Sequence, residues 1–398
     1  MKHGSLLLIC LLTVVSPAQF AGEVHAANDN ASPHLVPGDS QRGRAVFSSK
    51  GCATCHSLPG DPRTKIWPML GDTKGERLTG AEIAARLWNH GPAMWSTMAK
   101  VLFQKTPFTG TEMADLFAFL YYLDLLDPPG DAVKGRWVFE QKGCANCHPM
   151  DLVETESAEL SISYWSAHTD PIRLARAMWN HAPRMQPQIS RKLGSWPELE
   201  ETDMADLVAF VLNVNKIAEK KEFHLGDQAR GRKLFRAKRC ADCHRESRGG
   251  GGVGPSIPEM KGVARSVGGL GGMMWNHFPK MNAMTDKTQF KWVSLRQGEM
   301  ADLIAFLFSV GYFVEAGDPS KGREIFVSKR CSTCHEGPNS RGGNIRLPGG
   351  SISFVSIAVA LWNHGPVMME SIQRAGLEWP MLTREQVVNL AAYLGAGD

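Results

Sequence analysis

The sequence predicts an all-α protein built from four tandem helical units of about ninety residues each. A pair of cysteines followed at once by a histidine recurs four times, with first cysteines 92, 96 and 91 residues apart. Similar amphipathic helix patterns precede and follow each copy, and no strand alternation of useful length is present. The 398 residues are 43% hydrophobic, which is enough apolar mass for several cores.

The first 26 residues have the pattern of a secretory signal peptide. A basic start at Lys2 precedes a ten-residue apolar run over 6–15, and Val24-His25-Ala26 is typical of a cleavage site. The run is too short to cross a bilayer. We therefore expect an exported, periplasmic protein whose mature chain has no transmembrane segment.

The repeat predicts four domains after the signal peptide. Short joints rich in proline, glycine and aspartate separate them, so the units should pack together rather than hang on long tethers. The predicted domains are 36–127, 130–218, 226–315 and 317–398.

The first helix of each unit follows a shared frame, D-x-x-[RK]-G-R-x-x-F-x-x-K-x-C-x-x-C-H. The leading aspartate is well placed to cap the helix N-terminus. Gly43 and Phe47 are four residues apart and therefore lie on one helix face. The four capping aspartates are Asp39, Asp131, Asp227 and Asp318.

The last helix of each unit is a second amphipathic stretch. Residues 112–120, "EMADLFAFL", place apolar side chains at i, i+3, i+4 and i+7. Copies follow at 203–211 and 299–307, with a looser copy, "QVVNLAAYL", at 386–394. Thr383 and Gln386 form a predicted capping box before that last copy.

Cys-x-x-Cys-His is the attachment sequence of haem c. The two thiols form thioether bonds to the porphyrin, and the adjacent histidine ligates the iron. A zinc site or a dithiol redox motif would not require a histidine at the next position in all four copies. The predicted attachment cysteines are Cys52, Cys55, Cys144, Cys147, Cys240, Cys243, Cys331 and Cys334, and the proximal ligands are His56, His148, His244 and His335.

A second motif, Trp-Asn-His-x-Pro-x-Met, also occurs once per unit and offers two candidates for the other iron ligand. Its methionine follows the proximal histidine by 38, 37, 37 and 33 residues, and its histidine by 34, 33, 33 and 29. Spacing alone does not choose between them. The proline is expected to end a helix and to turn the chain so that the thioether points back toward the iron.

With these motifs, each unit resembles the class I c-type cytochromes, from about residue 36 to the end of the chain. The resemblance implies crossed first and last helices, with the glycine admitting an aromatic residue of the last helix. It also implies a distal methionine, and a Gly-Pro carbonyl that orients the proximal histidine. Gly254-Pro255 matches that last feature and Pro68 is a candidate in the first unit, whereas His148 and His335 have no clear equivalent. The matching aromatics are Phe119, Phe210, Phe306 and Tyr393, and the implied distal ligands are Met94, Met185, Met281 and Met368.

The remaining residues of the motif need another role if methionine is the ligand. We expect the tryptophan and asparagine to pack on the porphyrin or to donate to a propionate; the alternative is that they only finish a core helix. The histidines would hydrogen-bond a carbonyl or a propionate. They are His90, His181, His277 and His364.

These features predict electron transfer between redox partner proteins through four covalent, six-coordinate haems, without catalysis. One alternative is a haem enzyme of the peroxidase or sulfur-compound dehydrogenase type, for which the fourth unit, with its shorter spacing and looser last helix, is the place to look. Another is a subunit docked on a membrane redox complex. The net charge of +4 does not suggest a nucleic-acid partner. Basic residues beside the third and fourth cysteine pairs could steer acidic partners or be an ordinary solvated face.

Overall fold

The computed structural model describes the chain in segments. These are residues 38–58, 78–150, 160–218, 226–246, 253–257, 264–288, 291–310, 317–336, 342, 345 and 352–396. Every regular element within them is an α-helix or a short 3-10 turn, in agreement with the predicted all-α class. The predicted signal peptide, residues 1–26, and Pro68 lie outside the described residues.

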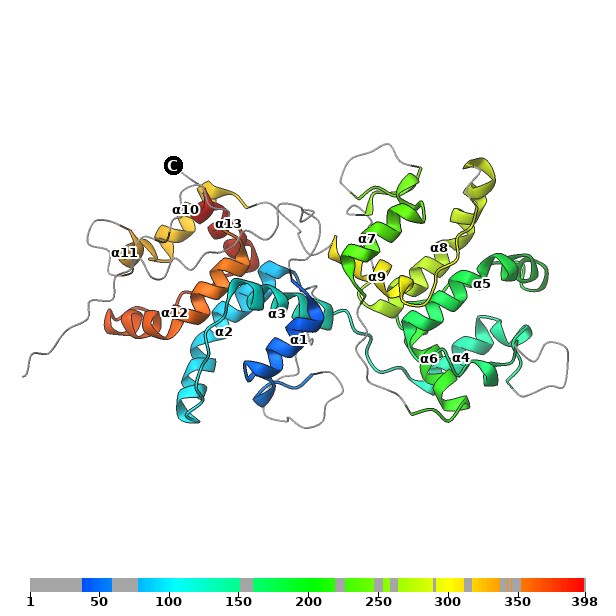
Figure 1. The fold of residues 1–398 in the computed structure, drawn as a ribbon, viewed down its shortest axis with the longest axis horizontal. Coiled ribbons are helices and arrows are strands. Elements are labelled where there is room, and N and C mark those ends of the chain that lie inside the picture. Colours follow the sequence, from blue (N-terminus) through cyan, green and yellow to red (C-terminus); the bar gives the residue numbers. More distant parts are fainter. Residues whose placement is uncertain are drawn as a thin grey trace, which may run out of the picture. The chain divides into compact units, whose positions relative to one another are not determined.

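Four repeats of the same helix arrangement follow one another along the chain, and we number them units 1 to 4 (Figure 1). Each has a first helix, a short cysteine-histidine turn, a long middle helix and a last helix. The first helices are α1 Ser40–Ser49, α4 Ala132–Gln141, α7 Gln228–Ala237 and α10 Pro319–Ser328. The middle helices are α2 Gly80–Lys100, α5 Pro171–Lys192, α8 Val267–Thr288 and α12 Phe354–Arg374. The last helices are α3 Gly110–Leu123, α6 Asp203–Val214, α9 Glu299–Ser309 and α13 Arg384–Gly395.

The first helix packs against the last helix in every unit, as the resemblance implied. A Cβ placed on Gly43 would lie 1.9 Å from the carbonyl oxygen of Asp115, so only glycine allows this approach. One turn away, the rings of Phe47 and Phe119 lie 5.6 Å apart. The same ring contact recurs as Phe139–Phe210, Phe235–Phe306 and Phe326–Tyr393.

A buried polar side chain on the last helix also ties it to the start of the first helix. Asp115 accepts the backbone N–H of Asp39 at 2.6 Å, while Asp39 itself caps α1, as predicted. Asn389 accepts the N–H of Asp318 at 2.8 Å in unit 4. The looser last helix of unit 4 therefore keeps the same connection, with an amide in place of the carboxylate.

The middle helices do not end at the motif proline, which corrects the prediction of a loop there. α2 continues through Pro92 to Lys100, and α5, α8 and α12 likewise contain Pro183, Pro279 and Pro366. Proline in a helix removes one N–H donor and leaves the carbonyl four residues earlier without its usual partner. A group outside the helix must therefore satisfy that carbonyl.

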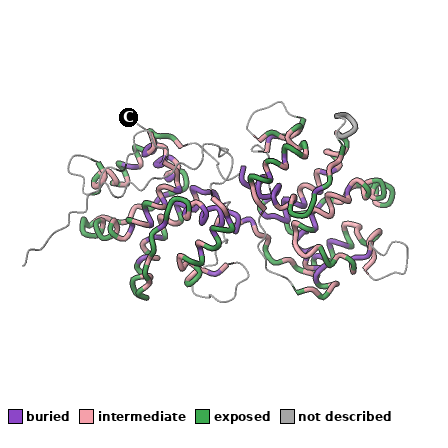
Figure 2. The backbone as a smooth tube through the Cα atoms, in the orientation of Figure 1, coloured by how far each residue is buried: buried purple, intermediate pink, exposed green. Residues whose placement is uncertain are grey.

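The units associate in pairs through their middle helices. α2 of unit 1 packs against α12 of unit 4, and α5 of unit 2 packs against α8 of unit 3 (Figure 1). Unit 1 also contacts unit 3, because the Tyr121 hydroxyl donates to the Phe308 carbonyl at 2.6 Å and Tyr122 donates to the Ala305 carbonyl at 2.9 Å. Together with the packing of α1 on α3 and of α7 on α9, these contacts leave most residues of α3 and α9 buried (Figure 2).

Candidate functional site

Each cysteine pair lies on a tight turn at the end of the first helix. In unit 1 the residues Cys52–Thr54 form a 3-10 turn, and the His56 N–H donates to the Cys52 carbonyl at 2.9 Å. The residue before the first cysteine is left-handed in all four copies, with φ of 79° at Gly51, 78° at Gly143, 63° at Arg239 and 62° at Arg330. In each copy this residue follows the first helix and begins the turn that carries both cysteines and the histidine.

The thiols are free and partly buried in all four turns. Burial raises the pKa of the first cysteine of each pair to about 11, so these groups are protonated at neutral pH. These four are Cys52, Cys144, Cys240 and Cys331.

The predicted proximal histidines of units 2 and 3 are oriented through their Nδ1 atoms. His244 Nδ1 lies 3.1 Å from the Pro255 carbonyl oxygen, which is the contact expected of Gly254-Pro255. His148 Nδ1 lies 2.9 Å from the Leu160 carbonyl oxygen, so unit 2 has this support from a residue that the sequence did not suggest. When Nδ1 carries the proton for such a bond, Nε2 keeps its lone pair and can bind a metal.

In units 3 and 4 a glycine also packs closely against the ring of the proximal histidine. A Cβ on Gly254 would lie 2.8 Å from His244 Nδ1, and a Cβ on Gly342 would lie 2.7 Å from His335 Nδ1. Both glycines donate their N–H to the carbonyl of the preceding cysteine, Cys243 or Cys334. Gly342 therefore takes the place of Gly254 in unit 4, where no equivalent was expected.

The histidine of the second motif faces the proximal histidine. The ring centres of His56 and His90 are 6.2 Å apart, and those of His244 and His277 are 6.1 Å apart. Burial lowers the pKa of His56, and the neighbouring His90 lowers it further. In the same way, burial and then His244 lower the pKa of His277.

The motif methionines lie on the same helices, four residues after these histidines. All four are half-buried, and Met94 and Met185 pack against the hydrophobic core. Residues at i and i+4 share a helix face, so each histidine and methionine point to the same side, about 6 Å apart along the axis. Methionine ligation by Met94, Met185, Met281 and Met368 stays a prediction.

The tryptophan and asparagine of the motif donate their N–H groups to the paired unit and not to a propionate. Their packing on the porphyrin stays a prediction. The Trp88 indole donates to the Pro380 carbonyl at 2.6 Å. The Asn89 side chain pairs with both backbone groups of Leu382, donating to its carbonyl at 2.8 Å and accepting its N–H at 2.9 Å. An asparagine that satisfies both groups of one residue acts as a short piece of β ladder.

The motif proline makes a fourth hydrogen bond between the paired units possible. Because Pro92 has no N–H, the Trp88 carbonyl is free to accept the Trp379 indole at 3.2 Å. We call these four hydrogen bonds the clasp. Each clasp joins the Trp-Asn pair of one unit to the four-residue segment that precedes the last helix of the paired unit.

The clasp recurs in both directions in both pairs. In unit 1, Lys105 stands where the other units have tryptophan, and its ammonium donates to the Trp362 carbonyl. The indole donors to the remaining carbonyls are Trp196 to Trp275 and Trp292 to Trp179. The asparagine pairings are Asn363 with Phe108, Asn180 with Leu295 and Asn276 with Leu199.

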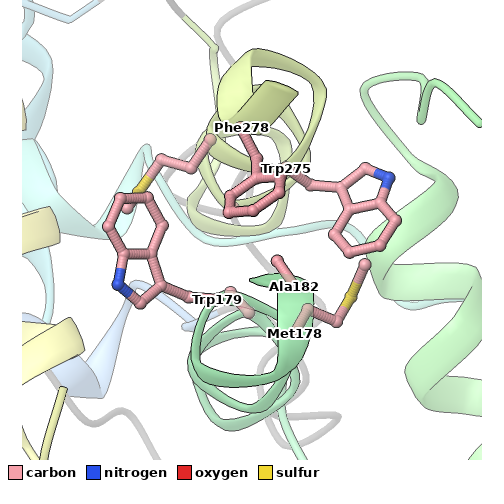
Figure 3. A pocket seen from close by; sticks show the side chains of 8 residues that line it. Met178, Trp179, Ala182, Trp275 and Phe278 are labelled. Atoms are coloured by element: carbon pink, nitrogen blue, oxygen red, sulfur yellow. The ribbon is translucent and has the colours of Figure 1, made fainter. Parts of the chain in front are cut away.

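Apolar side chains fill the crossing of each helix pair. A small hollow between α5 and α8 is lined by Met178, Trp179, Ala182, Trp275 and Phe278, and the two indole nitrogens point away from it toward their acceptors (Figure 3). In the pair of units 1 and 4, Trp95 occupies the corresponding space beside Gly91 and Gly365. Different residues thus fill the two crossings, while both pairs keep the clasp, with Lys105 in place of one tryptophan.

Sequence reasoning missed the receiving half of the clasp. The four segments are 105–108, 196–199, 292–295 and 379–382, and three of them read Trp-x-x-Leu. The signal was present as a tryptophan seven residues before each of the last three amphipathic copies, which begin at 203, 299 and 386. No local pattern in these segments indicates which unit's Trp-Asn pair binds to each of them, because that depends on how the units pair.

Comparison with known families bears on the middle of the chain. Residues 132–215 and 228–311 each match the family model described as Cytochrome c. These segments are cytochrome c domains. Neither the search of curated proteins nor the search of solved structures finds a match. The two matched cytochrome c domains are units 2 and 3, the pair joined by α5 and α8.

Covalent haem c is implied for the two cytochrome c domains, and their residues fit it. Both have paired free thiols, a proximal histidine held through Nδ1, and the second histidine of the motif nearby on the middle helix. The count of four haems rests on the four cysteine pairs. In unit 1, His56 Nδ1 is buried without a hydrogen-bond partner among the described residues.

The described residues give no support for a direct metal site. Among them, no three or more histidine, cysteine or acidic side chains gather where they could hold an ion. The described helices also include none with the length and apolarity needed to cross a membrane.

The basic cluster beside the cysteines of unit 3 is paired within that cytochrome c domain. Glu246 accepts from Arg232 and from Arg236, each at 2.7 Å. Lys238 pairs with Glu299 at 2.9 Å, and Arg239 with Asp242 at 2.7 Å. Four basic side chains of the cluster are therefore paired with acidic neighbours, and the steering of acidic partners stays a prediction.

Proposed function

We propose that this protein is an exported tetrahaem c-type cytochrome that transfers electrons between redox partner proteins. The observation that carries the proposal is one set of features repeated four times. Each unit has a Cys-x-x-Cys-His turn at the end of its first helix and a middle helix that carries a second histidine and a methionine.

In this proposal each cysteine pair holds one haem by two thioether bonds, and the adjacent histidine ligates its iron. The bound haem supplies one-electron chemistry between ferric and ferrous iron. The chain supplies orientation, since carbonyls such as that of Pro255 fix the ring of the proximal histidine through Nδ1. The histidine or the methionine of the middle helix would be the second ligand of the iron.

Unit 4 gives no specific reason to prefer an enzyme. Asn389 keeps the connection between its first and last helices, and Asn363 and Trp362 make the same clasp as in the other units. Its histidine and methionine candidates are both present on α12. With His335 and one of these candidates, the chain would hold the iron through two of its own side chains, which favours electron transfer over substrate binding in this unit as well.

Export and partners belong to the same proposal. Haem c is attached outside the cytoplasm, which agrees with the expected signal peptide at residues 1–26. The electron donor and acceptor are proposed to be redox proteins, one of which could belong to a membrane complex. The N-terminal sequence of the mature protein tests export, because cleavage after residue 26 would leave Ala27 as the first residue.

The intact mass of the purified protein tests the central claim. We expect the mature chain plus four covalently bound haems, and a loss of one haem for each unit whose two cysteines are changed to alanine. The series Cys52→Ala/Cys55→Ala through Cys331→Ala/Cys334→Ala covers all four units. A folded protein carrying fewer than four haems, or a double variant that loses none, would contradict the proposal.

A further inference from the structure

The separation of the facing histidines matches that of two ligands on one iron. An imidazole nitrogen binds a first-row metal at about 2 Å, so two imidazoles on opposite sides of one ion have ring centres about 6 Å apart. The observed distances are 6.2 Å for His56 and His90 and 6.1 Å for His244 and His277. Two independent units therefore have the same spacing.

The proximal histidine of unit 3 has one ring nitrogen available for a metal. In unit 3 the Pro255 carbonyl occupies His244 Nδ1, which leaves Nε2 as the donor atom for a metal. The ring of His277, on α8, lies across from it.

We propose that His90 and His277 are the distal iron ligands of units 1 and 3, and that His181 and His364 have the same role in units 2 and 4. The inference rests on the proposed function, since it requires a haem in each unit. A methionine ligand was expected on a loop after the proline, whereas α2 and α8 continue through Met94 and Met281 as helix.

The clasp prevents the helix from exchanging one ligand for the other. Moving Met94 to the position of His90 would need a shift of α2 by about 6 Å along its axis. Such a shift would break the bonds of Trp88 and Asn89, the residues directly before His90, to Pro380 and Leu382. The motif thus ties the distal ligand to the interface between paired units.

Ligand identity has a consequence for the redox potential. A thioether ligand favours ferrous iron and raises the redox potential. A second imidazole ligand favours ferrous iron less, so the potential is lower. A protein with histidine on both sides of its irons would exchange electrons with lower-potential partners than a His/Met cytochrome does.

The test compares histidine and methionine variants of the same helix. His90→Ala and His277→Ala are compared with Met94→Ala and Met281→Ala, all in the full-length holoprotein. Electron paramagnetic resonance of the ferric form and carbon monoxide binding to the ferrous form report the state of each iron. We expect each histidine variant to convert one of the four haems to a high-spin, carbon monoxide-binding form, and each methionine variant to leave all four low-spin.

The reverse pattern would overturn the inference. The unmodified protein provides a second measurement, because a thioether bound to ferric iron gives a weak far-red absorption band. We expect this band to be absent; a band of the strength given by four thioether-ligated haems would sink the proposal even if no variant could be purified. The haem count of each sample separates the two claims, since a count below four contradicts the proposed function and not the choice of ligand.

Discussion

The indole of Trp379 donates a hydrogen bond of 3.2 Å to the backbone carbonyl of Trp88, a residue of another unit 291 positions earlier. The bond is possible because Pro92, four residues after Trp88, cannot supply the N–H that this carbonyl would accept in an ordinary helix. The Trp-Asn-His-x-Pro sequence can therefore be understood as one device. Tryptophan and asparagine form hydrogen bonds with the paired unit, and proline leaves a carbonyl free to accept one from it. Histidine faces the cysteine-histidine turn.

The two prolines of α5 allow a matched test of this explanation. Pro183 frees the Trp179 carbonyl for Trp292, whereas Pro187 is exposed on the same helix and belongs to no clasp. Pro187→Ala should stabilise the protein by up to about 3 kcal/mol, because it removes a helix-breaking residue.

Pro183→Ala should give a clearly smaller gain or a loss, because the new N–H competes with the Trp292 indole. Urea unfolding of the two holoprotein variants measures the difference. Equal gains from both substitutions would show that the freed carbonyl contributes nothing to the pairing.

Removing the indole donor should weaken the pairing of units 1 and 4. Trp379→Phe keeps most of the aromatic contact with Trp88, whose ring lies 5.2 Å away, but leaves the Trp88 carbonyl without a partner. We expect a loss of about 1–3 kcal/mol in the free energy of unfolding. Trp137→Phe is the control, since Trp137 is 59% exposed, and it should change stability by less than about 0.5 kcal/mol. Similar effects of the two changes would argue against the clasp.

The contact between first and last helices should not tolerate a methyl group. A Cβ at position 43 would overlap the Asp115 carbonyl, whereas a Cβ at Gly110 would meet nothing within 4 Å. Gly43→Ala should cost about 1–3 kcal/mol or more, because the helices must separate. Gly110→Ala should be neutral or slightly stabilising, since alanine favours helix. Thermal unfolding followed by far-ultraviolet circular dichroism measures both, and an unaffected Gly43→Ala protein would contradict the observed approach.

A buried carboxyl between units 1 and 3 should make stability depend on pH. Burial raises the pKa of Asp127 to about 6 from an ordinary 3.8, the nearby Glu201 adds to the rise, and hydrogen bonds from Ser266 and Gly268 oppose it. Because the folded-state pKa is the higher one, the protonated form stabilises the fold. That stability is fully present below pH 3.8 and is lost as the pH rises through 6.

The loss should be on the order of 2 kcal/mol between pH 4 and pH 7. Asp127→Asn cannot ionise and can still accept the Gly268 N–H, so this part of the pH dependence should disappear. Urea unfolding at several pH values compares it with the native protein and with Glu370→Gln, a change at an exposed site. An Asp127→Asn protein whose pH dependence equals that of the native chain would contradict the prediction.

The local features of each unit could be predicted from sequence patterns alone. Asp39 and its three equivalents cap the first helices, Gly43 admits the last helix, and Thr383 with Gln386 forms the capping box of α13, all as predicted. The reason is that short-range geometry decides them: a cap acts within one turn, and a glycine four residues from an aromatic marks one helix face.

The contacts of the Trp-Asn-His-x-Pro motif could not be predicted in this way, because they depend on how the units pack. Leu160 supports His148 across a segment with no recognisable signal, and Trp88 binds a segment that begins at Trp379. Spacing along the chain could not choose between pairing unit 1 with unit 2 and pairing it with unit 4, since every unit has both halves of the clasp. The choice depends on contacts between residues far apart in sequence, and these exist only once the four units have packed.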